Sequence, residues 1–186
     1  MTVRAQALLL LAACALAVTS LQAADRSASL YQMHEKLLSQ DGKAIDLDVY
    51  RGHKVLVTMF YGSCPATCPL IIDTLRAIER KVDATSAAQL RVLLVSFDAE
   101  NDTPDALKKL ALSRRIDTAR WTLAHAEKSA VRRIAAALNI QYKLLPDGGF
   151  SHATIISLLD ADGKIVVQSA ELGHADPALL KALNGG

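Results

Sequence analysis

The sequence has few aromatic residues and no concentrated positive charge. Phe, Trp and Tyr make up 4% of the 186 residues, the formal net charge is +2, and no run of Lys or Arg is longer than two. A surface that binds nucleic acid usually needs a basic patch for the phosphates or aromatic rings for the bases. We therefore expect no nucleic-acid partner.

The chain also lacks internal repeats, low-complexity segments and a recognisable linker. Hydrophobic residues make up 51% and charged residues 22% of the sequence, a composition typical of a folded domain rather than a disordered segment. The length suffices for one well-formed hydrophobic core. A single domain is therefore expected.

No apolar run reaches the length of a membrane-spanning helix, which needs about 20 residues. An apolar stretch over residues 5–18 follows Arg4 and precedes the small residues Ala23 and Ala24. This order of a basic start, a short apolar region and small residues is typical of an export signal. We predict a signal peptide over residues 1–24.

The remainder, residues 25–186, is then the domain itself. Two alternatives stay open at the N-terminus. The stretch LAAC, residues 11–14, resembles a lipoprotein box that would make Cys14 the lipidated first residue, or the signal stays uncleaved as an anchor. Only these alternatives attach the protein to a membrane. All readings place the domain outside the cytoplasm, in the bacterial periplasm, either soluble or lipid-anchored.

Apolar runs and amphipathic segments alternate along the domain. Continuous apolar runs predict buried strands, and apolar residues spaced three and four apart predict helices. We expect strands over 54–61, 90–97 and 120–125, helices over 69–82, 101–115 and 127–140, a turn-rich loop over 142–150, a hairpin over 153–170, and a last helix from Asp176. This order predicts an α/β fold with a mixed central sheet flanked by helices.

Two cysteines, Cys64 and Cys68, lie where the first buried strand passes into a helix. If the signal is removed, they are the only cysteines left. The N–H groups and the dipole at a helix N-terminus favour a thiolate, so we expect these thiols to ionise easily. At this spacing the two sulfurs can bond to each other or bind one soft cation together.

A purely structural role for the pair is less well supported. A disulfide between Cys64 and Cys68 closes a very short loop and removes little entropy from the unfolded chain. A structural zinc site usually has four ligands, and no second cysteine pair exists. His152, directly before the expected strand at 153, is the histidine that we expect beside the cysteine loop. Two thiolates and one imidazole suit Cu(I) and, with modest rearrangement, Cu(II).

At these residues the sequence resembles the Sco/SenC family, exported thioredoxin-like proteins that carry copper to respiratory enzymes. CPATCP resembles the family's Cys-Pro-x-x-Cys-Pro motif, VSFDAENDTP (95–104) its Val-Ser-x-Asp-Pro-x-x-Asp-Thr-Pro stretch, and SHATIISLLDADG (151–163) the segment with its metal-binding histidine. Two departures are Ala99 in place of proline and Ser151 in place of an acidic neighbour of the histidine.

The resemblance implies a thioredoxin-like fold and a copper site. Cys64, Cys68 and His152 correspond to the three copper ligands, and Asp98 to the acidic residue of the second motif. The implied function is a metallochaperone, not an enzyme, that delivers Cu(I) or Cu(II) to the dinuclear copper centre of a respiratory enzyme such as cytochrome c oxidase. A thiol reductant or another copper chaperone would be further partners.

A second function stays open, a periplasmic thiol-disulfide oxidoreductase that keeps the copper-site cysteines of a partner reduced. Cys64 and Cys68 would then be a catalytic redox pair that forms a mixed disulfide with the partner. Redox enzymes of this fold generally have two residues between the cysteines. They also have a proline beside the cysteine pair. Here three residues intervene and His152 takes the place of the proline, which favours metal binding. A peroxidase would need an isolated low-pKa nucleophile, which the paired motif does not supply.

Overall fold

The computed structural model describes residues 28–64 and 67–185. The predicted signal peptide, residues 1–24, and Cys14 lie outside these residues. Within them, no helix has both the length and the apolar character needed to cross a membrane.

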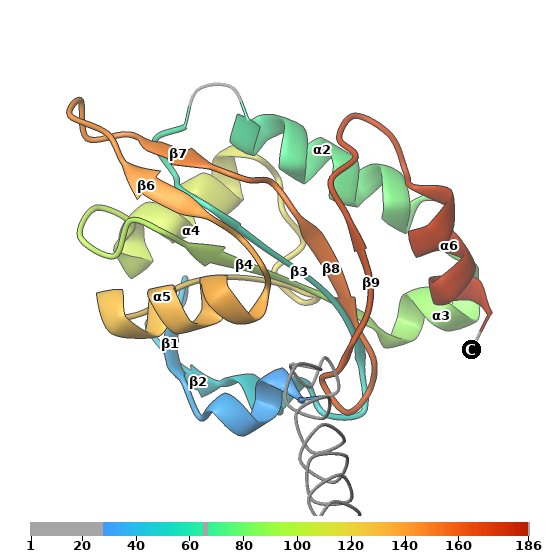
Figure 1. Ribbon diagram of the computed structural model, residues 1–186. Helices are drawn as coiled ribbons and strands as arrows, with labels where there is room; N and C mark the ends of the chain where they lie inside the picture. The colour runs from blue at the N-terminus through green and yellow to red at the C-terminus, as the bar shows by residue number, and fades with distance from the viewer. Residues whose placement is uncertain (1–27, 65–66, 186) are drawn as a thin grey trace, which may run out of the picture.

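A seven-stranded mixed sheet forms the centre of the protein (Figure 1). Its order is β2-β1-β5-β4-β3-β8-β9, in which β3, β4 and β5 run parallel and the other neighbours pair antiparallel. The strands are β1 (Lys36–Ser39), β2 (Ala44–Asp46), β3 (Lys54–Phe60), β4 (Leu90–Ser96), β5 (Trp121–His125), β8 (Ile156–Leu159) and β9 (Ile165–Ser169). The predicted mixed sheet is confirmed, and the fold is thioredoxin-like.

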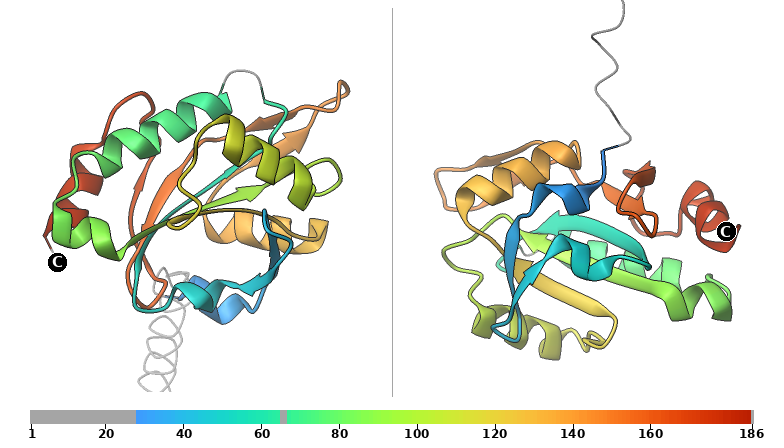
Figure 2. Two further views of the ribbon diagram at one scale, coloured as in Figure 1. Left: turned by 180° about the vertical axis from the view of Figure 1, so that it is seen from behind. Right: turned by 90° about the horizontal axis from the view of Figure 1, so that it is seen from below.

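Helices cover both faces of this sheet. They are α2 (Thr67–Glu79), α3 (Ala84–Gln89), α4 (Pro104–Ser113), α5 (Lys128–Ala137) and α6 (Pro177–Asn184), with short 3-10 turns η1 (Leu30–Met33) and η2 (Leu47–Tyr50). Figure 2 shows α2 and α4 on one face and α5 on the other. The buried side chains of β3 and β4 lie between these layers, which explains their continuous apolar runs.

The predicted helices are present, with ends that differ by one to three residues from the predicted ranges, and side-chain caps fix the starts of α4 and α6. Thr103 caps α4 by accepting a hydrogen bond from the Ala106 N–H, and Asp176 caps α6 by accepting one from the Ala178 N–H. Both helices then begin with proline, at Pro104 and Pro177, where the missing N–H costs nothing.

The segment 142–150, predicted as a loop, forms most of a second small sheet instead. Strands β6 (Tyr142–Leu144) and β7 (Phe150–His152) pair antiparallel in a hairpin, and His152 is the last residue of β7 rather than the residue before a long strand. Residues 145–149 form the predicted turn, but the prediction was wrong for 142–144 and for Phe150, because three-residue strands carry too little alternation to be recognised in a sequence. Figure 1 shows the hairpin near the end of β3, where α2 begins.

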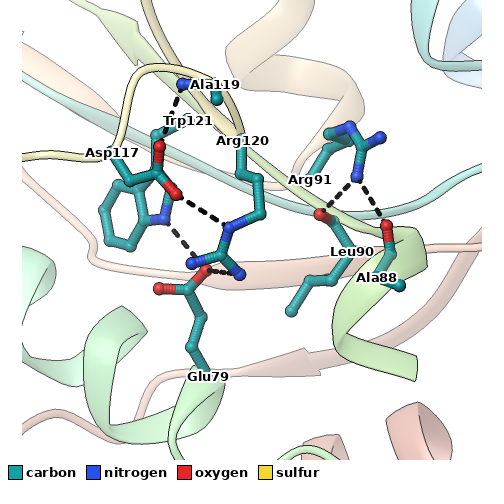
Figure 3. A network of polar contacts seen from close by, with 8 residues as sticks. All are labelled: Glu79, Ala88, Leu90, Arg91, Asp117, Ala119, Arg120 and Trp121. Atoms are coloured by element: carbon teal, nitrogen blue, oxygen red, sulfur yellow. Dashed lines mark hydrogen bonds and ion pairs between the residues drawn. The ribbon is translucent and has the colours of Figure 1, made fainter. Parts of the chain in front are cut away.

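The far end of α2 is fixed to the sheet by a polar network (Figure 3). The Glu79 carboxylate accepts a hydrogen bond from the Trp121 indole N–H at 3.0 Å and pairs with Arg120 at 3.2 Å. Arg120 also pairs with Asp117 at 2.9 Å. Helix α2 is thereby anchored where it ends, at the start of β5.

Candidate metal centre

The parallel strands β3, β4 and β5 all end at one edge of the sheet, the edge at which open α/β sheets bind ligands. The loop with Cys64 follows β3, the segment with Asp98 and Asp102 follows β4, and Cys68 is the second residue of α2. The topology therefore brings residues far apart in sequence to the same end of the molecule.

Cys64 and Cys68 are brought together around the backbone of Tyr61. The Tyr61 carbonyl accepts the Cys64 N–H at 3.2 Å and the Cys68 thiol at 3.1 Å. Both cysteines are buried, and no disulfide joins them in this structure. The Cys64 side chain lies near enough to Cys68 to act on the ionisation of its thiol. The predicted pair is thus in place as two neighbouring thiols.

Burial raises the pKa of the Cys68 thiol to about 12, and the neighbouring Cys64 and Asp102 side chains add to the shift. We expected a thiol that ionises easily because Cys68 lies in the first turn of a helix. That expectation was wrong, since removal from water opposes the thiolate more strongly than the helix N-terminus favours it. A thiolate at this position therefore needs a cation to balance it.

His152 lies in a cluster of aromatic rings at the end of β7. Its ring centroid is 4.9 Å from that of Phe97 and 6.1 Å from that of Tyr61, the latter in an edge-on contact. Its Nδ1 is 3.2 Å from the Ala153 carbonyl oxygen. If Nδ1 carries the proton in this contact, Nε2 presents its lone pair, as in a typical metal-binding histidine.

The three predicted ligands are not assembled in this structure. In the part of the chain described, no three or more His, Cys, Asp and Glu side chains are grouped so that they could hold a metal ion. The two thiols lie together, whereas the His152 ring packs against the ring of Tyr61, the residue that both cysteines contact.

Asp98 supports its own loop and is not a solvated carboxylate. It is buried, and it accepts hydrogen bonds from the Asn101 backbone N–H at 3.1 Å and from the Asn101 side-chain amide at 2.8 and 3.0 Å. These contacts hold the turn between β4 and α4.

A second carboxylate, Asp102, contacts the cysteine loop and was not singled out in the sequence. One of its oxygens accepts the Gly62 N–H at 2.8 Å and also the Ser96 hydroxyl. Burial raises the pKa of Asp102, and these two hydrogen bonds oppose the rise. The stretch 95–104 contains both aspartates, but only the fold shows that Asp102 reaches the loop.

Tyr61 was also missed, although it precedes the first cysteine by only three residues. Its ring lies 5.3 Å from that of Phe150, and burial, followed by the effect of the nearby Cys64 side chain, raises the pKa of its hydroxyl. An aromatic residue at the end of a buried strand resembles an ordinary core residue, so nothing in the sequence marked it.

Comparison with known proteins identifies relatives of the whole domain. The SCO1/SenC family profile matches residues 23–183. A Bacillus subtilis protein named SCO1 protein homolog is 26% identical over 131 residues, which are 69% of this chain and 67% of the relative.

Two solved structures share the fold. Arabidopsis thaliana ScoI with copper bound has a TM-score of 0.70 at 17% identity, covering 81% of this chain and 94% of that chain. BsSco, described with a disulfide switch and as a member of the Sco family of cytochrome c oxidase assembly proteins, has a TM-score of 0.65 at 22% identity, covering 80% and 88%. Since the family profile extends over most of the sequence, we conclude that this chain belongs to the SCO1/SenC family.

Proposed function

We propose that this protein is a metallochaperone that binds one copper ion through Cys64, Cys68 and His152. The observation that carries the proposal is the pair of neighbouring buried thiols, in which burial opposes ionisation of Cys68. Metal coordination deprotonates a thiol and supplies the missing positive charge. Thiolate and imidazole together are ligands that copper accepts in either oxidation state.

His152 completes the proposed site by moving. Its ring packs against Tyr61 and Phe97 in this structure, so the hairpin β6–β7 or the cysteine loop shifts when copper binds. A site that closes around its cargo also opens to release it. We propose that the acceptor's own thiolates and imidazoles replace the ligands of the chaperone one at a time.

The acceptor that we propose is the dinuclear copper centre of a respiratory enzyme such as cytochrome c oxidase. The membership of BsSco in a family of cytochrome c oxidase assembly proteins supports this choice. We further propose that the domain works in the periplasm after export, where a thiol reductant or another copper chaperone prepares it for loading.

The test is an anaerobic titration of the reduced domain with Cu(I) and Cu(II), with and without the predicted ligands. One tightly bound copper per chain is expected, with a thiolate-to-Cu(II) absorption band. Cys64→Ser and Cys68→Ser should each lower the affinity by more than about a hundredfold, beyond the range typical of changes outside the ligand shell. Wild-type protein that binds no copper tightly would overturn the proposal.

His152→Ala tests the third ligand separately. Cu(II) affinity should fall by about tenfold or more while the dithiol still forms and loses its disulfide normally. His174→Ala is the matched control, because His174 lies beyond β9 with its side chain 58% exposed, paired with Glu171. Equal Cu(II) affinity in the His152 variant and the wild type would remove His152 from the site.

A thiol-disulfide oxidoreductase is the second candidate, and the shared contact of Cys64 and Cys68 with the Tyr61 carbonyl favours it. Two cysteines held by one carbonyl can form a disulfide once their sulfurs reach bonding geometry. Absence of tight copper binding, together with rapid disulfide exchange with a protein substrate, would move the assignment to this function.

A further inference from the structure

Two aromatic rings contact His152 in a position where it does not complete a group of three metal-binding side chains within the described residues. The centroids of the Phe97 and His152 rings lie 4.9 Å apart, with the planes tilted by 45°. The Tyr61 ring meets the same imidazole edge-on, with centroids 6.1 Å apart and planes at 84°. Both arrangements fall within the range of favourable ring pairs. We call this arrangement of His152 its resting position.

Phe97 is a fixed support for this position. It directly follows β4, is 4% exposed, and its backbone N–H donates to the Phe60 carbonyl at 2.7 Å, which ties it to the end of β3. Its ring also lies 4.7 Å from that of Tyr142 and 6.0 Å from that of Phe150, both in the hairpin β6–β7. Phe97 therefore holds the hairpin to the central sheet.

His152 can leave the resting position only if these ring contacts break or the hairpin moves. It is the last residue of β7 and pairs with Tyr142 across the hairpin, so its backbone is held by that pairing. Its side chain has the two ring contacts and the contact of Nδ1 with the Ala153 carbonyl. Of the two ring contacts, the one with Phe97 has the shorter distance between centroids.

We propose that Phe97 is a positioning residue that holds His152 in the resting position and thereby makes the site favour Cu(I) over Cu(II). The proposal rests on the copper-binding function proposed above. Thiolates are soft ligands that select Cu(I), so Cu(I) depends mainly on Cys64 and Cys68. Cu(II) prefers nitrogen and oxygen ligands, so it depends more strongly on the imidazole.

The preference follows from the populations of the two His152 positions. Cu(II) binds tightly to the molecules in which the imidazole has left the rings, so the measured affinity is lowered in proportion to their fraction. An ion held mainly by the two sulfurs is little affected by that fraction. Phe97 thus changes the specificity of the site without contacting the metal.

Phe97→Leu removes the ring and keeps an apolar side chain. Loss of one ring pair should raise the Cu(II) affinity by about fivefold. The Cu(I) affinity should change by less than about twofold, because the sulfurs are untouched. Damage to the fold would lower both affinities, so a rise for Cu(II) alone is a result that a purely structural role does not give.

Phe150→Leu is the matched control. It removes a ring of the same cluster, one that packs against Tyr61 and Phe97, whereas the rings found against His152 in the described part of the chain are those of Tyr61 and Phe97 themselves. Both copper affinities of Phe150→Leu should stay within about twofold of the wild type, since the two ring pairs of His152 are kept.

A second readout needs no copper. In the reduced, copper-free domain, NMR should show the Hδ2 and Hε1 signals of His152 shifted by the ring currents of its neighbours. Phe97→Leu should remove most of this shift, and Phe150→Leu should keep it. If Phe97→Leu does not fold, Phe97→Met serves in its place, and a wild-type His152 without any ring-current shift overturns the proposal by itself.

The outcomes separate this proposal from the copper-binding function. A Cu(II) affinity of Phe97→Leu that is unchanged or lower than that of the wild type would overturn the role of Phe97, as would an equal rise in Phe150→Leu. If copper binding still requires Cys64, Cys68 and His152 in that case, the proposed function stands. Wild-type protein that binds neither ion tightly would refute the function and this inference together.

Discussion

The two ends of helix α2 are built in opposite ways. At its last residue, Glu79 pairs with Arg120 and with the indole of the buried Trp121 (Figure 3). At its start, the Cys68 thiol donates to the Tyr61 backbone carbonyl, in a site where burial opposes its ionisation. One end offers complementary charges and strong acceptors, and the other offers weak donors and acceptors.

The difference shows how one helix serves both stability and chemistry. A buried donor that has a carboxylate partner keeps its place, because losing that partner is costly. Thiols make weak hydrogen bonds and can exchange them for a metal or for each other at little cost. The anchored end fixes the axis of α2, so the cysteine end can change partners without loss of the fold.

The largest expected effect comes from breaking the anchored end. Glu79→Ala leaves the Trp121 indole N–H buried without an acceptor, which should lower the free energy of unfolding by about 2 kcal/mol. Copper affinity should change less than twofold. Denaturant unfolding measures the first quantity, and copper titration measures the second.

Asp73→Ala is the control for Glu79, since the Asp73 carboxylate lies on the same helix but is 69% exposed. It should change the stability by less than about 0.5 kcal/mol. If the two variants were equally stable, or if Glu79→Ala weakened copper binding in parallel with stability, the proposed division between the two ends would be wrong.

A smaller effect is expected from crowding the cysteine end. A Cβ at Gly62 would lie 2.4 Å from Oδ1 of Asp102, whose other oxygen is already held by the Gly62 N–H and the Ser96 hydroxyl. Gly62→Ala should therefore displace the loop and cost about 1 kcal/mol of stability. It should also weaken copper binding several-fold, unlike Glu79→Ala.

Ser63→Ala is the control for Gly62, because Ser63 is exposed in the same loop. It should match the wild type in both stability and copper affinity. A Gly62→Ala variant with the stability and copper affinity of the wild type would mean that Asp102 does not hold the loop against Gly62.

The smallest expected effect is a change in how the free energy of unfolding depends on pH, through the titration of Asp102. Burial raises its pKa in the folded protein, so the folded state holds a proton that the unfolded state has already released. The contribution of Asp102 to stability is then fully present below the unfolded pKa, about 3.9, and is lost as the pH rises toward the folded pKa. Asp102→Asn cannot titrate, so its stability relative to the wild type should rise over this range.

Denaturant unfolding at a series of pH values from about 3 to 7 checks this prediction, with the unfolded pKa near the lower limit. Asn keeps one oxygen for the Gly62 N–H and the Ser96 hydroxyl, so the fold should survive the change. A relative stability of Asp102→Asn that stays flat or falls as the pH rises would contradict the assigned direction of the shift.

Much of the fold could be predicted from the sequence because its signals are local. The apolar runs at 54–61 and 90–97 became β3 and β4, and the spacing of apolar residues at 69–82 became α2. The strands β6 and β7 could not be predicted, since three residues carry no clear period and only pairing defines them. Helix α3 was missed for a related reason, because its six residues bury no side chain.

The sequence by itself determined which chemistry is available: two cysteines at a strand-to-helix junction and one histidine farther along, in an order that resembles a known family. Only the tertiary structure decided how these groups behave. Burial reversed the expected acidity of Cys68, and a contact across forty positions brought Asp102 to the loop at Gly62. The physical reason is that residue type sets what a group can do, whereas desolvation and long-range contacts depend on which segments the fold packs around it.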